Sequence, residues 1–122
     1  MPYVLLVDDE QNIRLTLSAI LRMHGHEVAV AEDGDAALEM AQQREPEILV
    51  SDVFMPGGLN GIHLAILIKA QFPQCKILLV SGHAAAMDLN REARDRGHTF
   101  EIMAKPMVIP EFLSKIEQLQ AA

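Results

Sequence analysis

Three acidic side chains stand side by side near the start of the chain, directly after an apolar run. Asp8, Asp9 and Glu10 follow the run Leu5 to Val7. Adjacent carboxylates repel one another, and partial burial makes each of them harder to ionise. Such a cluster has three possible explanations. The side chains point into water, they stand at a helix N-terminus that favours negative charge, or they form part of a site for a cation.

Three further polar residues stand at the ends of later apolar segments. They are Asp52, Ser81 and Lys105. Taken singly, each has an ordinary structural explanation, because an aspartate at a strand end is usually a turn or cap residue and Ser-Gly is a common turn. Together with Asp8 and Asp9, however, they place charged or hydrogen-bonding side chains at the ends of four of the five apolar segments in the chain. That joint pattern indicates a functional site.

The residue types suit phosphoryl transfer. Carboxylates such as Asp8, Asp9 and Asp52 attract a hard divalent cation, and Mg²⁺ typically takes one or two of them together with waters and phosphate oxygens. A bound cation also keeps the acids ionised despite their proximity. An ionised Asp52 can then act as a nucleophile towards phosphorus, while Lys105 and Ser81 supply a positive charge and a hydroxyl donor to the transferred group.

Short apolar segments alternate with helical patterns five times along the chain. Gly57, Gly58 and Gly61 are expected to form a flexible loop, and Pro110 suits an early helix position. The predicted strands are Tyr3–Val7, Glu27–Ala31, Glu47–Ser51, Lys76–Val80 and Phe100–Met103, and the predicted helices are Glu10–His24, 36–41, Ile62–Phe72, Ala84–Arg96 and a last helix from Pro110.

This alternation predicts an α/β fold with a parallel sheet and helices on both faces. The common flavodoxin-like, doubly wound order 2-1-3-4-5 places the first and third strands side by side at the point where strand order reverses. The carboxyl ends of the strands would then bring Asp8, Asp9, Asp52, Ser81 and Lys105 to one rim.

Length, charge and composition exclude several classes of protein. The 122 residues form one expected domain, 1–122, without an effector domain. A net charge of -7 argues against direct binding of nucleic acid or of anionic membranes. No apolar run reaches the roughly 20 residues of a membrane span, and the N-terminus lacks the pattern of a signal peptide. With Cys75 as the single cysteine, a cytoplasmic protein is expected.

Four motifs in this order resemble the receiver domain of two-component response regulators over the whole chain. The motifs are VDDE (7–10), DVFMPGG (52–58), VSGHA (80–84) and AKP (104–106). The resemblance implies that Asp52 accepts a phosphoryl group from a phosphohistidine on a sensor histidine kinase or histidine phosphotransfer protein. It also implies that Ser81 acts as the switch hydroxyl, so that phosphorylation controls a partner or an attached output.

The resemblance also implies roles for the residues around Asp52. Asp9 would bind Mg²⁺ directly and Asp8 largely through water, with the backbone carbonyl of Phe54 as a further ligand. Lys105 would contact the phosphoryl oxygens. The peptide bond before Pro106 would be cis, which is the minority state at roughly 5% of such bonds.

The sequence departs from the usual receiver pattern at several positions. Ile102 stands where many receivers carry the aromatic residue that flips with the switch, Gly97 lies one residue further from Lys105 than usual, and the loop GGLNG is one residue longer. Phe54 and His83 each stand two residues past an active-site position, where an attacking water would approach. We hypothesise that the bulk of Phe54 slows loss of the phosphoryl group.

Other functions fit the same fold less well. A phosphatase with an aspartate nucleophile would need an acid where Phe54 stands, and a flavin carrier would need a phosphate cradle in place of three acids. A receiver-like interaction module that works without phosphorylation is the main alternative, although such modules tend to lose one or more of the site residues. A homodimer or output partner is expected to use the 84–122 face, and the histidines His24 and His26 are expected to be solvent-exposed.

Overall fold

The computed structural model describes residues 2–55, 57–82, 85–105 and 107–121. No helix within these ranges combines the length and the apolar character needed to cross a membrane. The strands are β1 Tyr3–Val7, β2 Glu27–Ala31, β3 Ile48–Asp52, β4 Lys76–Ser81 and β5 Glu101–Ala104. The helices are α1 Gln11–Met23, α2 Gly34–Gln43, α3 Gly61–Gln71, α4 Ala85–Asp95 and α5 Ile109–Ala121.

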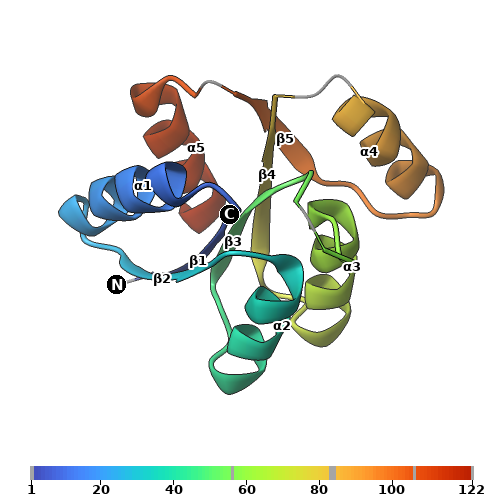
Figure 1. Ribbon diagram of the computed structural model, residues 1–122, viewed down its shortest axis with the longest axis horizontal. Helices are drawn as coiled ribbons and strands as arrows, with labels where there is room; N and C mark the ends of the chain where they lie inside the picture. Colours follow the sequence, from blue (N-terminus) through green and yellow to red (C-terminus); the bar gives the residue numbers. More distant parts are fainter. Residues whose placement is uncertain (1, 56, 83–84, 106, 122) are drawn as a thin grey trace.

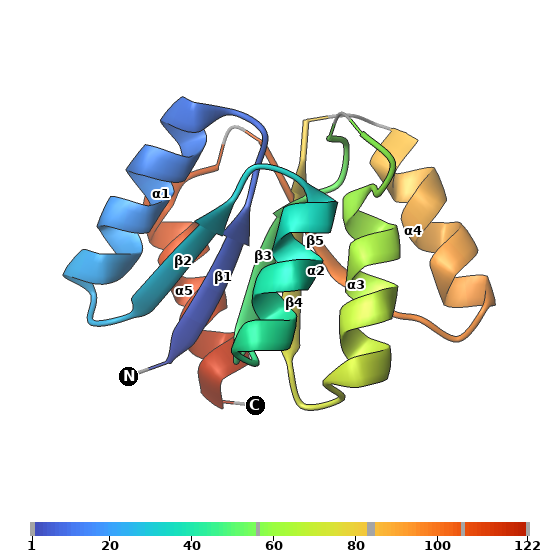
Figure 2. The same cartoon turned by 60° about the horizontal axis from the view of Figure 1, so that its bottom comes forward.

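The five strands form one parallel sheet in the order β2-β1-β3-β4-β5, which confirms the predicted topology. Helices α1 and α5 cover one face of the sheet, and α2, α3 and α4 cover the other (Figures 1 and 2). The carboxyl ends of the strands lie at the upper edge in Figure 2, so every loop that follows a strand opens on the same side.

Each face of the sheet carries its own apolar core. Leu5 and Leu49 pack towards α2, α3 and α4, whereas their chain neighbours Leu6 and Val50 pack towards α1 and α5. Successive side chains of a strand point to opposite faces, so a central strand covered on both sides must be apolar at every position. This requirement explains the unbroken apolar runs that identified the strands in the sequence.

Strands β3, β4 and β5 end one residue later than predicted, and each helix begins one or two residues from its predicted start. Strand β3 includes Asp52 and β5 includes Ala104, because both residues are paired in the sheet. Gly61, expected in a flexible loop, is buried and begins α3. The preceding residue, Asn60, caps this helix by accepting a hydrogen bond of 2.8 Å from the amide of His63.

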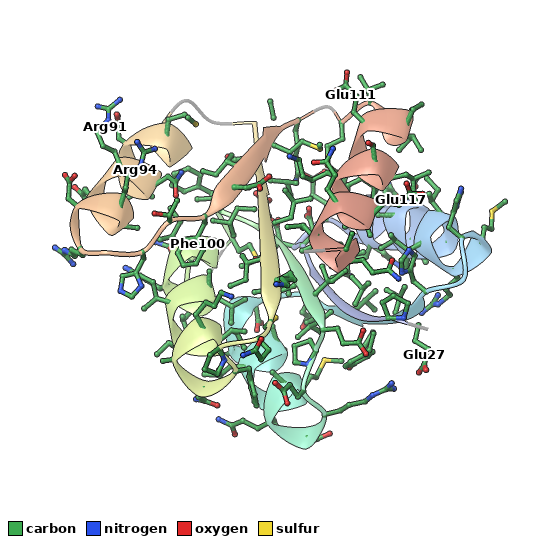
Figure 3. All side chains as sticks on the ribbon, turned by 180° about the vertical axis from the view of Figure 1, so that it is seen from behind. Glu27, Arg91, Arg94, Phe100, Glu111 and Glu117 are labelled. Atoms are coloured by element: carbon green, nitrogen blue, oxygen red, sulfur yellow. The ribbon has the colours of Figure 1, made fainter. Side chains whose placement is uncertain are left out.

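Gly97 closes α4 in the left-handed conformation, with φ of 89°. The amide of His98 donates to the carbonyl of Ala93 and the amide of Gly97 to that of Arg94, the paired bonds of a Schellman cap. Gly97, which lies one residue further from Lys105 than usual, therefore serves to end α4, and β5 still forms after it. Phe100 lies on the sheet side of α4, whereas the exposed Arg91 projects from its outer side (Figure 3).

His26 is buried, so the prediction that both histidines near Gly25 are exposed was wrong for this residue. His26 lies between the end of α1 and the start of β2, and its side chain is buried. His24, at the C-terminal cap of α1, is exposed. Among the described residues, Nδ1 of His26 is buried without a hydrogen-bond partner. The sequence showed the turn but not which side of it faced the protein.

Candidate functional site

The register of the sheet brings the polar strand ends to one level. Val7 of β1 lies opposite Ser51, Asp52 of β3 lies opposite Val80, and Ser81 of β4 lies opposite Ala104. Asp8 and Lys105 directly follow the last residues of β1 and β5, and the amide of Lys105 donates to the carbonyl of Ser81 at 3.1 Å. The residues predicted at the rim therefore come from neighbouring strand ends at the upper edge of the sheet (Figure 2).

The ammonium group of Lys105 joins the first, third and fifth strands at this edge. Its Nζ donates a hydrogen bond of 2.8 Å to Oδ2 of Asp8 and one of 3.1 Å to Oδ2 of Asp52. The three side chains are largely buried, with exposed fractions of 15% for Lys105, 2% for Asp8 and 9% for Asp52. Three predicted site residues thus form one ion-paired group.

Burial and charge act in opposite directions on these groups. Burial raises the pKa of Asp52, the Lys105 ammonium works against this rise, and the negative charges of Asp8 and Asp9 add to it. Burial alone would lower the pKa of Lys105, but its bond to Asp8 and the charge of Asp52 outweigh burial and the pKa is raised. Lys105 therefore keeps its proton, and any further positive charge near Asp52 would act against the rise in the pKa of its carboxyl.

The acid cluster after β1 has the donor chemistry of a magnesium site. Carboxylate oxygens of Asp8, Asp9 and Glu10 all lie within 4.8 Å of one another. The side chain of Asp8 is buried and those of Asp9 and Glu10 are exposed, so the oxygens stand at a boundary where water can complete an octahedral shell. All-oxygen ligands with room for water are what Mg²⁺ requires, and the residues present fit this ion.

Glu10 was not among the predicted metal ligands. Its backbone amide donates to Oδ1 of Asp8 at 2.9 Å, which fixes the turn between β1 and α1. The same turn brings its carboxylate beside those of Asp8 and Asp9. In the sequence, only its place next to Asp8 and Asp9 indicated that Glu10 could be a metal ligand.

Two other residues hold the acids in place and were not predicted. A guanidinium nitrogen of Arg14 donates to the backbone carbonyl of Asp8 at 2.8 Å, from the first turns of α1. The hydroxyl of Ser51 donates to the backbone carbonyl of Asp52 at 2.9 Å. Neither residue lies in the four motifs. Both bond a backbone carbonyl, and the sequence pattern gives no sign of such a contact.

Gly61 sets how closely α3 approaches Asp52. A Cβ at this position would overlap the carbonyl oxygen of Asp52 and lie 2.9 Å from Cα of Val53. The amide of Gly61 also donates to the carbonyl of Val53 at 2.8 Å. Only a residue without a side chain can begin α3 here, and this contact fixes the backbone that carries Asp52.

The remaining predicted residues lie around this group or outside the described part of the chain. Ser81 is buried, with 5% of its surface exposed. Phe54 and Ile102 are partly buried and pack against the apolar core beneath α2, α3 and α4. His83 and Pro106, predicted as a modulating residue and as the site of a cis peptide bond, lie outside the described residues.

The sequence matches the family described as response regulator receiver domain over residues 4–117. It is 30% identical over 118 residues to transcriptional regulatory protein PrrA of Mycobacterium tuberculosis, in an alignment that covers 97% of this chain and 49% of PrrA. The chain therefore spans about half the length of this relative.

Two solved structures show the same architecture. Chemotaxis protein CheY4 of Vibrio cholerae superposes with a TM-score of 0.85 at 28% identity, covering 98% of each chain. Response regulator protein TrrA of Thermotoga maritima, solved in complex with Mg(2+)-BeF, gives a TM-score of 0.83 at 30% identity and covers 98% of this chain and 99% of that chain. The family match, the strand order and the ion-paired strand ends agree, and the chain belongs to the receiver domains of two-component response regulators, a family of signalling switches.

Proposed function

We propose that Asp52 accepts a phosphoryl group from a phosphohistidine on a sensor histidine kinase or histidine phosphotransfer protein. One observation carries this proposal: Lys105 holds Asp8 and Asp52 together at 2.8 and 3.1 Å from the ends of three strands. An ammonium group at this distance from a buried carboxylate is placed to contact a phosphoryl group attached to that carboxylate.

The transfer needs a nucleophile and groups that stabilise the negative charge on the transferred phosphoryl oxygens. A carboxylate oxygen of Asp52 attacks phosphorus, an O–P bond forms, and the N–P bond of the phosphohistidine breaks with its electron pair left on the imidazole. Charge spreads over the equatorial oxygens of the transferred group. Lys105 and the hydroxyl of Ser81 are the described side chains proposed to stabilise those oxygens.

A formal charge count supports a divalent ion at this site. The carboxylates of Asp8, Asp9 and Asp52 outnumber the single ammonium of Lys105, so the group carries an excess of negative charge that a divalent ion can balance. Asp9, Asp8 through water, Asp52 and the carbonyl of Phe54 are the proposed holders of Mg²⁺, and Glu10 is close enough to join them. When bound, the ion would neutralise negative charge on the carboxylates and the phosphoryl oxygens.

The output of the switch is proposed to run through the end of the sheet that carries Ser81. The carbonyl of Ser81 accepts from the amide of Lys105, so a shift of Ser81 acts directly on the end of β5. Ile102, in β5, lacks the aromatic ring that many receivers move, and we propose that packing of the 84–122 face transmits the change to a homodimer or output partner. The domain 1–122 would carry out this role in the cytoplasm.

Intact mass spectrometry tests the proposal. The protein is incubated with a small phosphodonor such as acetyl phosphate, with Mg²⁺ or with EDTA, as wild type and as Asp52→Ala. The expected result is a mass increase of one phosphoryl group for the wild type in Mg²⁺ and for no other sample. An unmodified wild type would contradict the proposal and favour an interaction module that works without phosphorylation.

A further inference from the structure

A groove outside the phosphorylation site runs between α1 and the edge strand β2. Its lining, called here the α1–β2 groove, consists of Gln11, Arg14, Leu15, Ser18, Arg22 and Val30. The five residues of α1 are spaced by three or four, except that Arg14 and Leu15 are adjacent, and so form one stripe of the helix. Leu15 and Val30 leave 60% and 38% of their surfaces exposed, so the groove presents two apolar side chains to solvent.

Strand β2 lies at the edge of the sheet, with β1 as its one neighbouring strand. The amide of Glu27 donates to the carbonyl of Pro2, and the carbonyl of Ala31 accepts from the amide of Asp8. In a parallel ladder the residues that bond to one neighbour alternate, so Glu27, Ala29 and Ala31 face β1. Val28 and Val30 consequently direct their backbone groups away from β1.

The outward edge of β2 is already used once for a hydrogen bond. Arg22 donates from its guanidinium group to the carbonyl of Val28 at 3.0 Å, across the groove. Within the described part of the chain, the next outward residue, Val30, has no comparable bond to its backbone. The edge can therefore accept a further extended segment beside Val30 without displacing a strand.

The charge of the groove is opposite to that of the rest of the chain. Its lining contains two arginines and no acid, although the chain has 17 acidic and 10 basic residues. Glu27, the acid of β2, forms an ion pair of 2.8 Å with Arg44. Both arginines are anchored by one bond to a backbone carbonyl, at Asp8 and at Val28, and a guanidinium has five N–H donors in all.

We propose that the α1–β2 groove binds an extended, acidic segment of a partner protein as an added strand outside β2. Backbone groups of the segment would pair with Val30. Because alternate residues of a strand share a face, an apolar side chain would contact Leu15 and Val30 while acids two positions before and after it meet Arg14 and Arg22. Charge complementarity favours this occupant over a symmetric contact between two copies of the chain, which would set the arginines of one groove against those of the other.

The probe is a capped peptide with threonine at alternate positions and glutamate, valine and glutamate between them. It is titrated into ¹⁵N-labelled protein and amide shifts are recorded. We expect saturable changes that centre on Leu15, Arg22 and Val30. Arg22→Gln should weaken binding by about threefold to fivefold, as the loss of one exposed ion pair allows, and the matched control Arg94→Gln, an exposed arginine of α4, should leave it unchanged.

Leu15→Ser removes the apolar contact without touching the bond to Val28, so it remains informative if Arg22→Gln disturbs β2. It should also weaken binding severalfold. The proposal is overturned if the peptide causes no saturable shifts, or if a peptide with lysine in place of glutamate binds equally well. It is also overturned if the protein alone self-associates through Leu15 and Val30, since the occupant would then be a second copy.

Discussion

Nζ of Lys105 donates a 3.1 Å hydrogen bond to Oδ2 of Asp52, a residue 53 positions earlier in the chain. The same ammonium bonds to Asp8 at 2.8 Å. A buried carboxylate without a positive partner is strongly disfavoured, so the lysine supports the fold as well as the proposed chemistry.

Replacing Lys105 with methionine should lower the free energy of unfolding by about 3 to 5 kcal/mol at neutral pH, because two buried carboxylates lose their partner. Urea unfolding in EDTA measures the change. The matched control is Lys115→Met, whose ion pair with Glu101 is far more exposed and should contribute at most about 1 kcal/mol. Equal losses for the two variants would show that Lys105 is an ordinary surface lysine.

Gly61→Ala should destabilise the protein by about 1 to 3 kcal/mol, the usual cost of forcing a group into a packed site. The added methyl would overlap the carbonyl of Asp52, so Mg²⁺-dependent phosphorylation should fall as well. Gly58→Ala is the control, because a Cβ there meets nothing within 4 Å. Thermal unfolding and intact mass measure the two effects, and a variant at position 61 that matched the control would contradict the proposed contact.

His26 should make the protein less stable in mild acid. Burial lowers the pKa of His26 below 6.5, the charge of His24 lowers it further, and Glu117 opposes them. The unfolded chain therefore binds the proton more readily than the folded one, so stability is present above pH 6.5 and is lost as the pH falls through this value towards the folded pKa. Unfolding measured across this range should show a smaller loss for His26→Leu, and parallel curves would refute the assignment.

Phe54→Asn should shorten the lifetime of the phosphorylated protein. Phe54, two residues after Asp52, is partly buried against the core, and we expect a smaller polar side chain to let water approach the phosphoryl group. Decay of the phosphorylated mass after removal of the phosphodonor gives the lifetime. An unchanged lifetime in Phe54→Asn would mean that another group limits access of water.

Much of the fold was predictable because the central strands are apolar on both faces and end at polar residues. Asp8, Asp52 and Lys105 could be placed together by strand order alone, and the structure confirms that they meet. Gly61, Glu10 and His26 could not be assigned in this way. Their roles depend on contacts across the fold or on which side of a turn faces the core, and short sequence patterns do not contain that information.

Chemical mapping of the phosphorylated residue tests the central claim most directly. Sodium borohydride reduces an aspartyl phosphate to homoserine, and peptide mass spectrometry then locates the reduced residue. After incubation with Mg²⁺ and acetyl phosphate, homoserine is expected at position 52 and should be absent when Mg²⁺ is replaced by EDTA. Phosphate retained at a hydroxyl such as that of Ser81, with position 52 unchanged, would contradict the account.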